Sequence, residues 1–315
     1  MLRYTIRRLL ELIPVLLIAS IAIWSLIYAV PGNPVSAIAG FDATPEQIAA
    51  TEARLGLDRP LYEQYYTWLV NVLRFDLGVS VVNGVPINEQ ILDRLPATIQ
   101  LTLATVLLSI FVGVPLGLIA AFASAKSFTG RAVSTFQALS LALPTFWVGM
   151  LLILVFSISL RWIPSIANYV PFFEDPWKAS VNAFLPALSM ALYFSSVLSR
   201  FVAASVSETM SMDFVWFARS KGIPEKRVMI RHMLRNAAIP VVTVIGLQLG
   251  ALLGGSIVVE VVFSYPGIGR MLFSAVSTRD YPTIQATVLL AVVGFLFVNF
   301  VVDLLYAVID PRVRL

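Results

Sequence analysis

Long apolar runs dominate the hydrophobic pattern of this chain, and polar segments separate them. Six runs stand out, at residues 9–30, 99–123, 133–160, 184–204, 239–263 and 284–309. A helix needs roughly 20 apolar residues to cross a hydrocarbon core of about 30 Å, so each run predicts one crossing. The pattern predicts an all-α integral membrane protein with six transmembrane helices.

The composition agrees with this pattern. Hydrophobic residues make up 58% of the 315 residues and charged residues only 13%, whereas soluble domains carry roughly 25% charged residues. The chain has no cysteine and a single histidine, His232, which excludes disulfides, thiol chemistry and a histidine-cluster metal centre. The net charge is +4, but the basic residues flank the apolar runs, which argues against a nucleic-acid partner.

The first run allows two interpretations. Arg3, Arg7 and Arg8 precede it and Ala37-Ile38-Ala39 follows it, as in a secretory signal peptide with its cleavage site. The run at residues 9–30 is longer than the roughly 7–15 residues of a signal-peptide core. We therefore favour a retained membrane anchor.

The distribution of charge predicts the orientation of the chain. With the N-terminus in the cytoplasm, the cytoplasmic segments hold 14 of the 22 Lys and Arg residues, and the longer outer segments hold the other eight. The segment at residues 31–98 has eight acidic residues against four arginines. The positive-inside rule therefore predicts that both termini face the cytoplasm.

These assignments divide the chain into four parts. Residues 1–30 form a tail and the first crossing, 31–98 an outer loop or cap, 99–309 a five-helix core with a cytoplasmic loop at 205–237, and 310–315 a cytoplasmic tail. Within the cap, residues 57–69 predict a short amphipathic helix, Thr44 and Pro45 open an earlier one, and residues 76–80 predict a turn. The five aromatic residues between Tyr62 and Phe75 argue against a disordered loop.

Small residues and prolines modify the predicted spans. Glycine recurs every four residues, at 113 and 117 and again at 246, 250 and 254, which predicts close helix packing or a closely packed helix that lines a path. Pro115 and Pro144 predict kinks, because proline removes a backbone donor.

The polar loop at residues 205–237 predicts a helix–turn–helix. One apolar face recurs at helical spacing, at Val206, Met210, Phe214, Phe217 and Ala218. Gly222 ends this helix as a C-cap, and Pro224 begins a second one. On the second helix arginines recur every four residues, at 227, 231 and 235, where they would face lipid phosphates or the acids of a partner.

Three uses of this loop are open to a membrane protein. It can dock a soluble partner, or it can rest on the bilayer surface as an amphipathic element. A DNA-binding helix–turn–helix is disfavoured, because predicted spans begin within a few residues of both ends.

Polar groups inside the spans are costly and therefore mark candidate functional positions. Glu260 is a candidate for a gate or packing role on the outer side and equally for a direct contact with a solute. Asp303 predicts a structural ion pair near the inner interface. The uncharged candidates are Gln137, Ser140, Gln248, Ser256 and Asn299.

Several segments carry a family resemblance. FARSKG at 217–222, followed by RHMLRNAAIP at 231–240, resembles the cytoplasmic "EAA" loop of ABC importer permeases. The resemblance is closest to the first permease subunit of the dipeptide/oligopeptide/nickel transporter family, and it covers nearly the whole chain. Further matching segments are RRL at 7–9 with IP at 13–14, VPGNP at 30–34, LGLDRP at 55–60, DLGVS at 76–80, RLPAT at 94–98, EVVFSYPGIG at 260–269 and DPR at 310–312.

The resemblance implies a type I ABC importer permease fold with a long periplasmic loop, in a bacterial inner membrane. It implies a second homologous permease subunit, two cytoplasmic ATPase subunits that bind ATP and Mg²⁺, and an extracytoplasmic substrate-binding protein. This chain would then be a transport subunit, not an enzyme, with no cofactor of its own. The path candidates under this interpretation are Ser140, Gln248, Ser256, Glu260 and Asn299.

The same resemblance identifies the loop as the element that docks to the ATPase. The coupling positions are Phe217, Ala218, Arg219, Lys221, Gly222, Ile223, Pro224 and Arg227. Trp216 and Phe217 occupy the positions of the family's glutamate and first alanine, so the usual glutamate salt bridge is not expected. The chain has no Gly-x-x-x-x-Gly-Lys-Ser/Thr phosphate loop, so its energy source would be a partner.

Alternatives remain for the cargo and for the class. The family transports di- and oligopeptides, and nickel chelates, glutathione or another small solute are alternatives. An ion-coupled secondary transporter would usually show internal repeats and broken helices at mid-membrane, and neither is evident. An intramembrane enzyme is disfavoured, because the spans contain no paired aspartates, Ser/His pair or zinc motif.

Overall fold

The structure is a computed structural model that describes residues 2–29, 44, 46, 52–53, 58–124, 126–166 and 168–309. Its helices are α1 (Leu2–Ala29), α4 (Leu61–Leu73), α5 (Ile87–Phe122), α6 (Phe128–Ala142), α7 (Thr145–Leu152), α8 (Pro176–Met210), α9 (Asp213–Ser220), α10 (Glu225–Arg227), α11 (Arg235–Gly255), α12 (Ile257–Val262), α13 (Ile268–Thr278) and α14 (Tyr281–Ile309). Two π-helical segments, η1 (Ile153–Ser159) and η2 (Val228–Leu234), continue α7 and α10.

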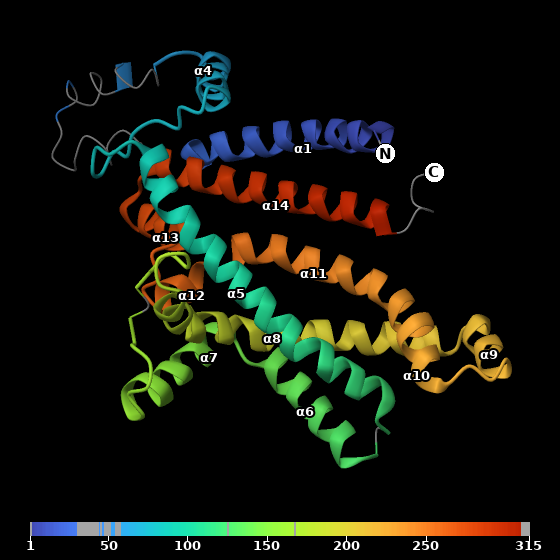
Figure 1. Cartoon of the computed structure of the whole chain (residues 1–315). Coiled ribbons are helices and arrows are strands. Elements are labelled where there is room, and N and C mark those ends of the chain that lie inside the picture. The colour runs from blue at the N-terminus through green and yellow to red at the C-terminus, as the bar shows by residue number, and fades with distance from the viewer. Residues whose placement is uncertain are drawn as a thin grey trace.

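The long helices lie side by side, and the short ones cover the two ends of the bundle. Helix α8 packs against α5 and α11, α11 packs against α14, and α14 packs against α1. The start of α1, the end of α14 and the α9–α10 turn lie at one end, while α4, α12 and α13 lie towards the other (Figure 1). The described residues contain no β-strand, only an isolated β-bridge between Val79 and Pro86.

An all-helical structure follows from the apolar composition. Hydrocarbon offers no partner to backbone N–H and C=O groups, so a spanning segment must satisfy them internally. Within the described ranges, four helices, namely α1, α5, α8 and α14, are long and apolar enough to cross a membrane. The number rises to six if two bent helix pairs each count as one span.

Three of the predicted spans differ from the observed helices. The run at 239–263 is divided at Ser256 between α11 and α12. The run at 133–160 is broken between α6 and α7, whose axes differ by 103°. Pro144 explains the break, because it has no N–H to donate and it disfavours helical backbone at Leu143. Helix α5 begins at Ile87, inside the stretch assigned to the outer loop, and it passes through Pro115. A hydropathy pattern does not reveal this extension of α5, because the first turns of the helix are polar.

Glycines bring the central helices into close contact. A Cβ atom at Gly113 would lie 2.7 Å from the carbonyl oxygen of Ser195, and one at Gly117 would lie 2.7 Å from that of Ser199. Both carbonyls belong to α8, so α5 and α8 touch at backbone distance. On α11, Gly250 packs against Phe295 of α14, whereas Gly254 has nothing within 4 Å. A Cβ atom at Gly246 would overlap the side chain of Val302 on α14. The predicted close packing is therefore confirmed at Gly113, Gly117, Gly246 and Gly250, but not at Gly254.

The outer segment folds against the bundle. The predicted helix at 57–69 is found as α4, with Pro60 as its N-cap. The buried carboxylate of Asp280 accepts a hydrogen bond from Ser80 Oγ at 2.5 Å and another from Thr283 Oγ1 at 2.8 Å. This aspartate joins the turn after α4 to the first residues of α14. The helix predicted after Thr44 lies largely outside the described residues.

The close approach of α5 and α8 gives a direct test. Alanine forms helix better than glycine by about 1 kcal/mol, so Gly→Ala in an open helix should be neutral or stabilising. At Gly117 the new methyl group meets α8, and we expect Gly117→Ala to reduce the free energy of unfolding by roughly 1–3 kcal/mol. Thermal unfolding of the purified chain in detergent measures the effect.

The matched control is Gly254→Ala, which makes the same substitution at a glycine with no neighbour within 4 Å. Equal stability of the two variants would contradict a backbone contact between α5 and α8.

Candidate coupling surface and translocation path

The polar loop forms a compact turn at the end of the molecule that carries the two chain ends (Figure 1). Helix α8 stops at Met210, α9 begins at Asp213, and residues 221–224 turn the chain into α10. Gly222 has a φ of +72°, a left-handed conformation that glycine adopts without a steric cost. Its N–H donates to the carbonyl of Arg219 at 2.9 Å, which ends the helix.

An ion pair closes the turn. Arg219 donates through Nε to Glu225 Oε2 at 3.1 Å and through Nη2 to Oε1 at 2.5 Å. The hydrogen bond from Arg219 lowers the pKa of Glu225, and the same bond raises the pKa of Arg219. Because the two residues lie on either side of Gly222, the planar guanidinium and carboxylate fix the shape of the turn.

The inner side of the turn is anchored to the bundle. Val215 and Ala218 on α9 are buried in a cluster with Val206 of α8 and with Val228 and Met233 of η2. The small side chain of Ala218 allows α9 to lie close to this cluster. The turn is therefore anchored to η2 and to the end of α8, although it extends beyond the long helices at this end of the molecule (Figure 1).

The predicted apolar face of this loop is wrong in part. The five residues do not share one face: Val206 and Ala218 are buried, but Phe214 and Phe217 are exposed. The reason is the interruption at Ser211 and Met212, which resets the helical register between α8 and α9. A periodicity counted across residues 206–218 therefore does not describe one face.

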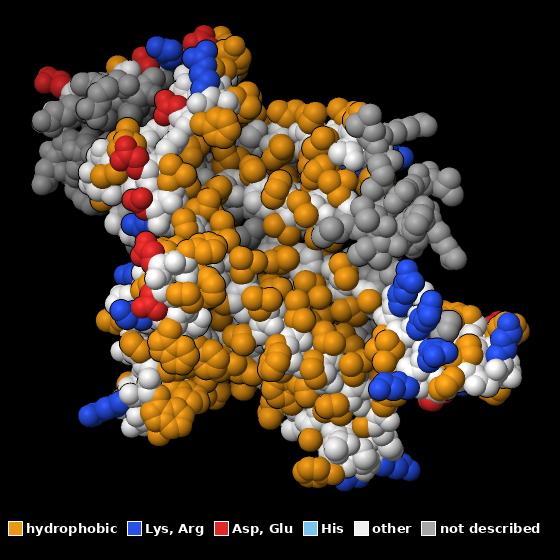
Figure 2. Space-filling model, in the orientation of Figure 1, with side chains coloured by type: hydrophobic (Ala, Val, Ile, Leu, Met, Phe, Trp, Pro, Cys, Tyr) orange, Lys and Arg blue, Asp and Glu red, His pale blue; other side chains and the backbone are white. Residues whose placement is uncertain are grey.

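The outer side of the turn presents aromatic and basic groups together. Trp216 and Phe217 are 70% and 61% exposed. The ammonium of Lys221 lies 4.3 Å from the centre of the Phe217 ring, a cation–π geometry. Arg227, Arg231 and Arg235 are all exposed, although a π-helical segment interrupts the predicted α-helix that carries them. Figure 2 shows Lys and Arg side chains gathered at this end of the molecule.

Glu260 lies at the opposite end and is completely buried, with 0% exposure. Its Oε1 accepts hydrogen bonds from Ser256 Oγ at 2.8 Å and from Thr98 Oγ1 at 3.1 Å. Its Oε2 accepts a hydrogen bond from the backbone N–H of Arg270 at 2.9 Å. The carboxylate thus joins α12, α5 and α13.

These contacts cap the N-terminus of α13. The N-cap residue of α13, Gly267, has no side chain to accept from the free N–H groups of the first turn. Glu260 accepts from Arg270, and Thr98 Oγ1 accepts from the N–H of Ile268 at 2.8 Å. A Cβ atom at Gly269 would lie 2.9 Å from Glu260 Oε2, so glycine there leaves room for the carboxylate.

The packing role of Glu260 is thus the one with observed contacts. The carboxylate of Glu260 is not exposed, so the structure does not support the other candidate role, a direct contact with a solute. Sequence reasoning had not identified Thr98, since one threonine in an apolar run carries no distinguishing pattern. Asp280 was also missed, although an aspartate directly before an apolar helical run is an N-cap pattern that could have revealed it.

The remaining path candidates lie apart from one another. Gln248 on α11 is buried and donates to the carbonyl of Phe194 on α8 at 3.1 Å. Gln137 on α6 donates to Ser199 Oγ at 2.7 Å. Ser140 lines a largely apolar cavity of about 230 Å³ between α6, α7 and α8. Asn299 on α14 lies beside Gly250. Of these six polar candidates, the structure brings only Ser256 and Glu260 together.

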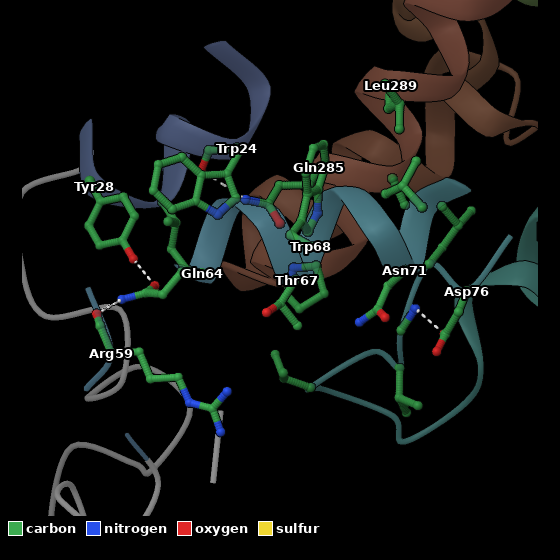
Figure 3. Close-up of a pocket in the computed structure, with 18 residues that line it drawn as sticks. Trp24, Tyr28, Arg59, Gln64, Thr67, Trp68, Asn71, Asp76, Gln285 and Leu289 are labelled. Atoms are coloured by element: carbon green, nitrogen blue, oxygen red, sulfur yellow. Dashed lines mark hydrogen bonds between the residues drawn. The ribbon is translucent and has the colours of Figure 1, made fainter. Parts of the chain in front are cut away.

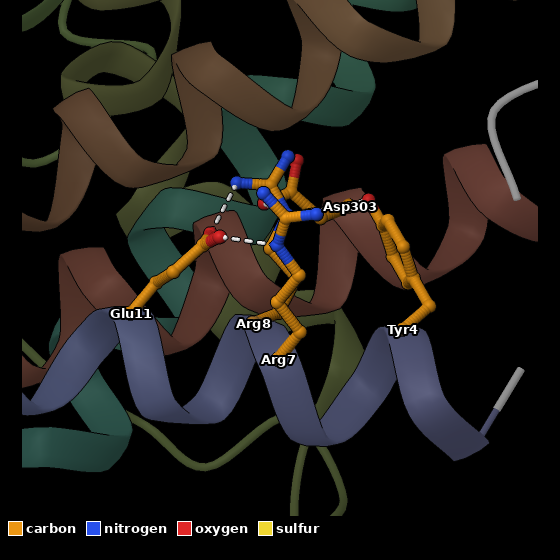
Figure 4. A network of polar contacts seen from close by, with 5 residues as sticks. All are labelled: Tyr4, Arg7, Arg8, Glu11 and Asp303. Atoms are coloured by element: carbon orange, nitrogen blue, oxygen red, sulfur yellow. Dashed lines mark hydrogen bonds and ion pairs between the residues drawn. The ribbon is translucent and has the colours of Figure 1, made fainter. Parts of the chain in front are cut away.

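An ion pair marks the other end of α14. Arg8 Nε lies 3.5 Å from Asp303 Oδ2, and Glu11 accepts from both Arg7 and Arg8 (Figure 4). The pairing predicted for Asp303 is therefore present, and it ties the first turns of α1 to the last turns of α14.

The sequence matches two family models. Residues 113–315 match the family described as "Binding-protein-dependent transport system inner membrane component", and residues 1–102 match its N-terminal companion, "Binding-prot-dependent transport system membrane comp, N-term". The two matches leave out only residues 103–112.

Curated relatives match along the whole chain. The "Glutathione transport system permease protein GsiC" of Escherichia coli (strain K12) is 41% identical over 314 residues, which is 100% of this chain and 99% of the relative. The protein of the same name from Salmonella typhimurium (strain LT2) matches equally. Among solved structures, "Crystal structure of an amino acid ABC transporter with histidines" aligns with a TM-score of 0.54 at 15% identity, over 69% of this chain and 93% of that one. This last likeness concerns the fold alone.

The capping role of Glu260 predicts a loss of stability on its removal. Glu260→Ala leaves a buried N–H and two hydroxyls without their acceptor, which costs roughly 1–3 kcal/mol. We expect a lower melting temperature and a lower amount of folded protein in the membrane. Glu174→Ala, at an exposed acidic residue, is the control and should change neither. A Glu260→Ala chain of normal stability that no longer supports uptake would point to the path instead.

Proposed function

Because the chain belongs to the family of inner membrane components of binding-protein-dependent transport systems, we propose that it forms the translocation path for short peptides, glutathione among them. The chain is a permease component of a binding-protein-dependent ABC importer. The observation that carries the proposal is the 41% identity over the full length to permeases that are named for glutathione transport.

The proposed cargo class joins two lines of support. The family resemblance of the sequence favours di- and oligopeptides, and glutathione is itself a tripeptide. The cargo is therefore a short peptide in this proposal, delivered by an extracytoplasmic binding protein.

The proposed topology has six crossings with both termini in the cytoplasm. Counting each bent helix pair as one span gives six. The positive-inside rule favours the cytoplasm for the end that carries the α9–α10 turn, where exposed Lys and Arg gather. The first turns of α1 and the last turns of α14 lie at that same end and are joined by the Arg8–Asp303 pair.

The α9–α10 turn is proposed to dock to one of two cytoplasmic ATPase subunits, and a second homologous permease completes the path. Three features support this role. The turn has a fixed shape, because the Arg219–Glu225 pair and Gly222 define it. Its inner side is packed on α8, so a displacement of the turn would be passed to the bundle. Its outer side exposes Trp216 and Phe217, which is a costly arrangement without a partner.

ATP and Mg²⁺ are assigned to the partner subunits in this proposal. The chain has no phosphate loop, so hydrolysis in another subunit would have to drive the movement. An ion-coupled secondary transporter would instead take up its cargo without ATP, which separates the two classes by experiment.

Proteoliposomes that contain the assembled complex, with the binding protein outside and ATP inside, test the proposal. Uptake of labelled glutathione or dipeptide should require both ATP and the binding protein. Uptake that needs neither, and that follows an imposed ion gradient, would contradict the importer mechanism.

Gly222 allows a sharper test of the docking turn. Gly222→Arg should leave the chain in the membrane yet reduce ATP-dependent uptake to background, because a large cation would occupy the tip that meets the ATPase. The left-handed backbone also adds strain of roughly 1–2 kcal/mol. Uptake in the same proteoliposomes, normalised to the amount of chain, measures the effect.

Gly84→Arg is the matched control. Gly84 has a φ of +71° against +72° for Gly222, and neither glycine has an atom within 4 Å of its Cβ position. The backbone strain is therefore equal, but Gly84 lies in the turn after α4. Normal uptake by Gly222→Arg, or an equal loss in both variants, would refute docking at Gly222.

A further inference from the structure

We propose that α4 lies in the lipid interface of the membrane leaflet remote from Arg8 and Asp303, with an apolar stripe inserted between the lipids. In the orientation proposed above, this is the outer leaflet. The inference concerns a surface that the transport mechanism does not use. The proposal requires only that α1 crosses the membrane. It does not depend on the docking of the α9–α10 turn or on the identity of the cargo.

The contacts of α4 fix its depth along α1. The Ser20 hydroxyl of α1 is hydrogen-bonded to Tyr65 of α4 at 2.8 Å. The rings of Trp24 and Tyr65 meet edge to face at 5.7 Å. Tyr28 donates a hydrogen bond to Gln64 (Figure 3). Helix α4 therefore lies against the last third of α1.

The rise of an α-helix per residue gives the depth of these contacts in the bilayer. A helix rises 1.5 Å per residue, so Tyr28 lies about 30 Å from Arg8 along α1, which equals the thickness of the hydrocarbon core. The Arg8–Asp303 ion pair marks one boundary of that core, and Tyr28 then lies near the other. Ser20 and Trp24 lie about 18 and 24 Å from Arg8. The residues that α4 contacts are thus inside the hydrocarbon or at its edge.

The sequence of α4 divides its surface by polarity. Apolar and tyrosine side chains follow one another at helical spacing along one stripe, at Tyr62, Tyr66, Leu69, Val70 and Leu73. Polar side chains follow a second stripe, at Glu63, Gln64, Thr67 and Asn71. Tyr62, Tyr66 and Leu73 are exposed, and no helix of the described chain covers them.

The polar stripe faces a different environment. Gln64, Thr67 and Asn71 line a cavity of about 420 Å³ together with Trp24, Arg59 and Gln285 (Figure 3). Gln64 also donates to the carbonyl of Arg59 at 2.8 Å. The polar groups of α4 are therefore directed into a cavity whose wall mixes polar and apolar side chains. On the apolar stripe Leu69 and Val70 are half-buried, while Tyr62, Tyr66 and Leu73 are exposed among the described residues.

Lipid is the occupant that agrees with both depth and chemistry. The part of α1 next to these contacts also exposes apolar side chains, at Leu17, Ile18 and Ile21. Tyrosine is enriched where hydrocarbon meets the headgroups, because its ring is apolar and its hydroxyl is polar. An amphipathic helix in the interface buries its apolar face about 5–10 Å below the headgroups, which matches the level between Trp24 and Tyr28.

The absence of cysteine from the natural chain permits a direct test. Tyr66→Cys and Leu73→Cys on the apolar stripe carry a nitroxide label in the complex with cysteine-free partner subunits, reconstituted in phospholipid nanodiscs. Collision with oxygen, which concentrates in hydrocarbon, is compared with collision with a water-soluble nickel chelate. Ile18→Cys on α1 is the lipid reference, and Asn83→Cys in the exposed turn is the water reference.

We expect positions 66 and 73 to resemble position 18, with an oxygen-to-nickel ratio several-fold above that at position 83. Glu63→Cys, on the polar stripe of the same helix, should give a lower ratio than either, and Tyr62→Cys serves as a third stripe position. Nickel accessibility at 66 and 73 equal to that at 83 would place α4 in water and overturn the proposal. Protection from both reagents would mean that a protein covers the stripe, a second permease or a binding protein, and would overturn it equally.

Discussion

The contact between α5 and α8 is the constraint on which the other features of this structure depend. In hydrocarbon no hydrophobic effect drives helices together, so their association relies on close packing. Gly113 and Gly117 of α5 allow the two backbones to meet. The carbonyls of Ser195 and Ser199 on α8 occupy the space that a side chain at either glycine would need. Gln137 and Gln248 add hydrogen bonds from α6 and α11 to the same helix. Helix α8 is consequently the most enclosed of the four long apolar helices.

This pair of helices connects the two candidate sites. Helix α8 continues to Met210, where it meets the α9–α10 turn through the cluster around Val206. Helix α5 carries Thr98, which caps α13 together with Glu260. A displacement of the turn would therefore act on α8, pass to α5 at the glycine contact and reach the cap of α13. Such a packed connection agrees with the proposal that another subunit releases the energy for transport.

Predictions from the sequence were correct where a single physical rule determines the local structure. Length and hydropathy predicted the membrane helices, glycine spacing predicted the contacts at 113 and 117, and the family resemblance was confirmed over the full length. Prediction failed where two rules competed. Helix α5 begins at Ile87 although its first turns are polar, and the interruption at Ser211 and Met212 leaves Phe217 exposed. The kink predicted at Pro144, by contrast, is present as a break between α6 and α7. The partners of Glu260 come from positions 98 and 270, a long-range juxtaposition that no local pattern contains.

The most direct test of the account is to identify what lies against the tip of the α9–α10 turn in the native membrane. A photoreactive benzoylphenylalanine at Lys221, activated in intact membranes, would attach to its neighbour for identification by mass spectrometry. The account predicts an adduct with a subunit that carries an ATP-binding phosphate loop, and no such adduct from the same probe at Asn83. Adducts with lipid alone at Lys221, or an ATPase captured equally from Asn83, would contradict it.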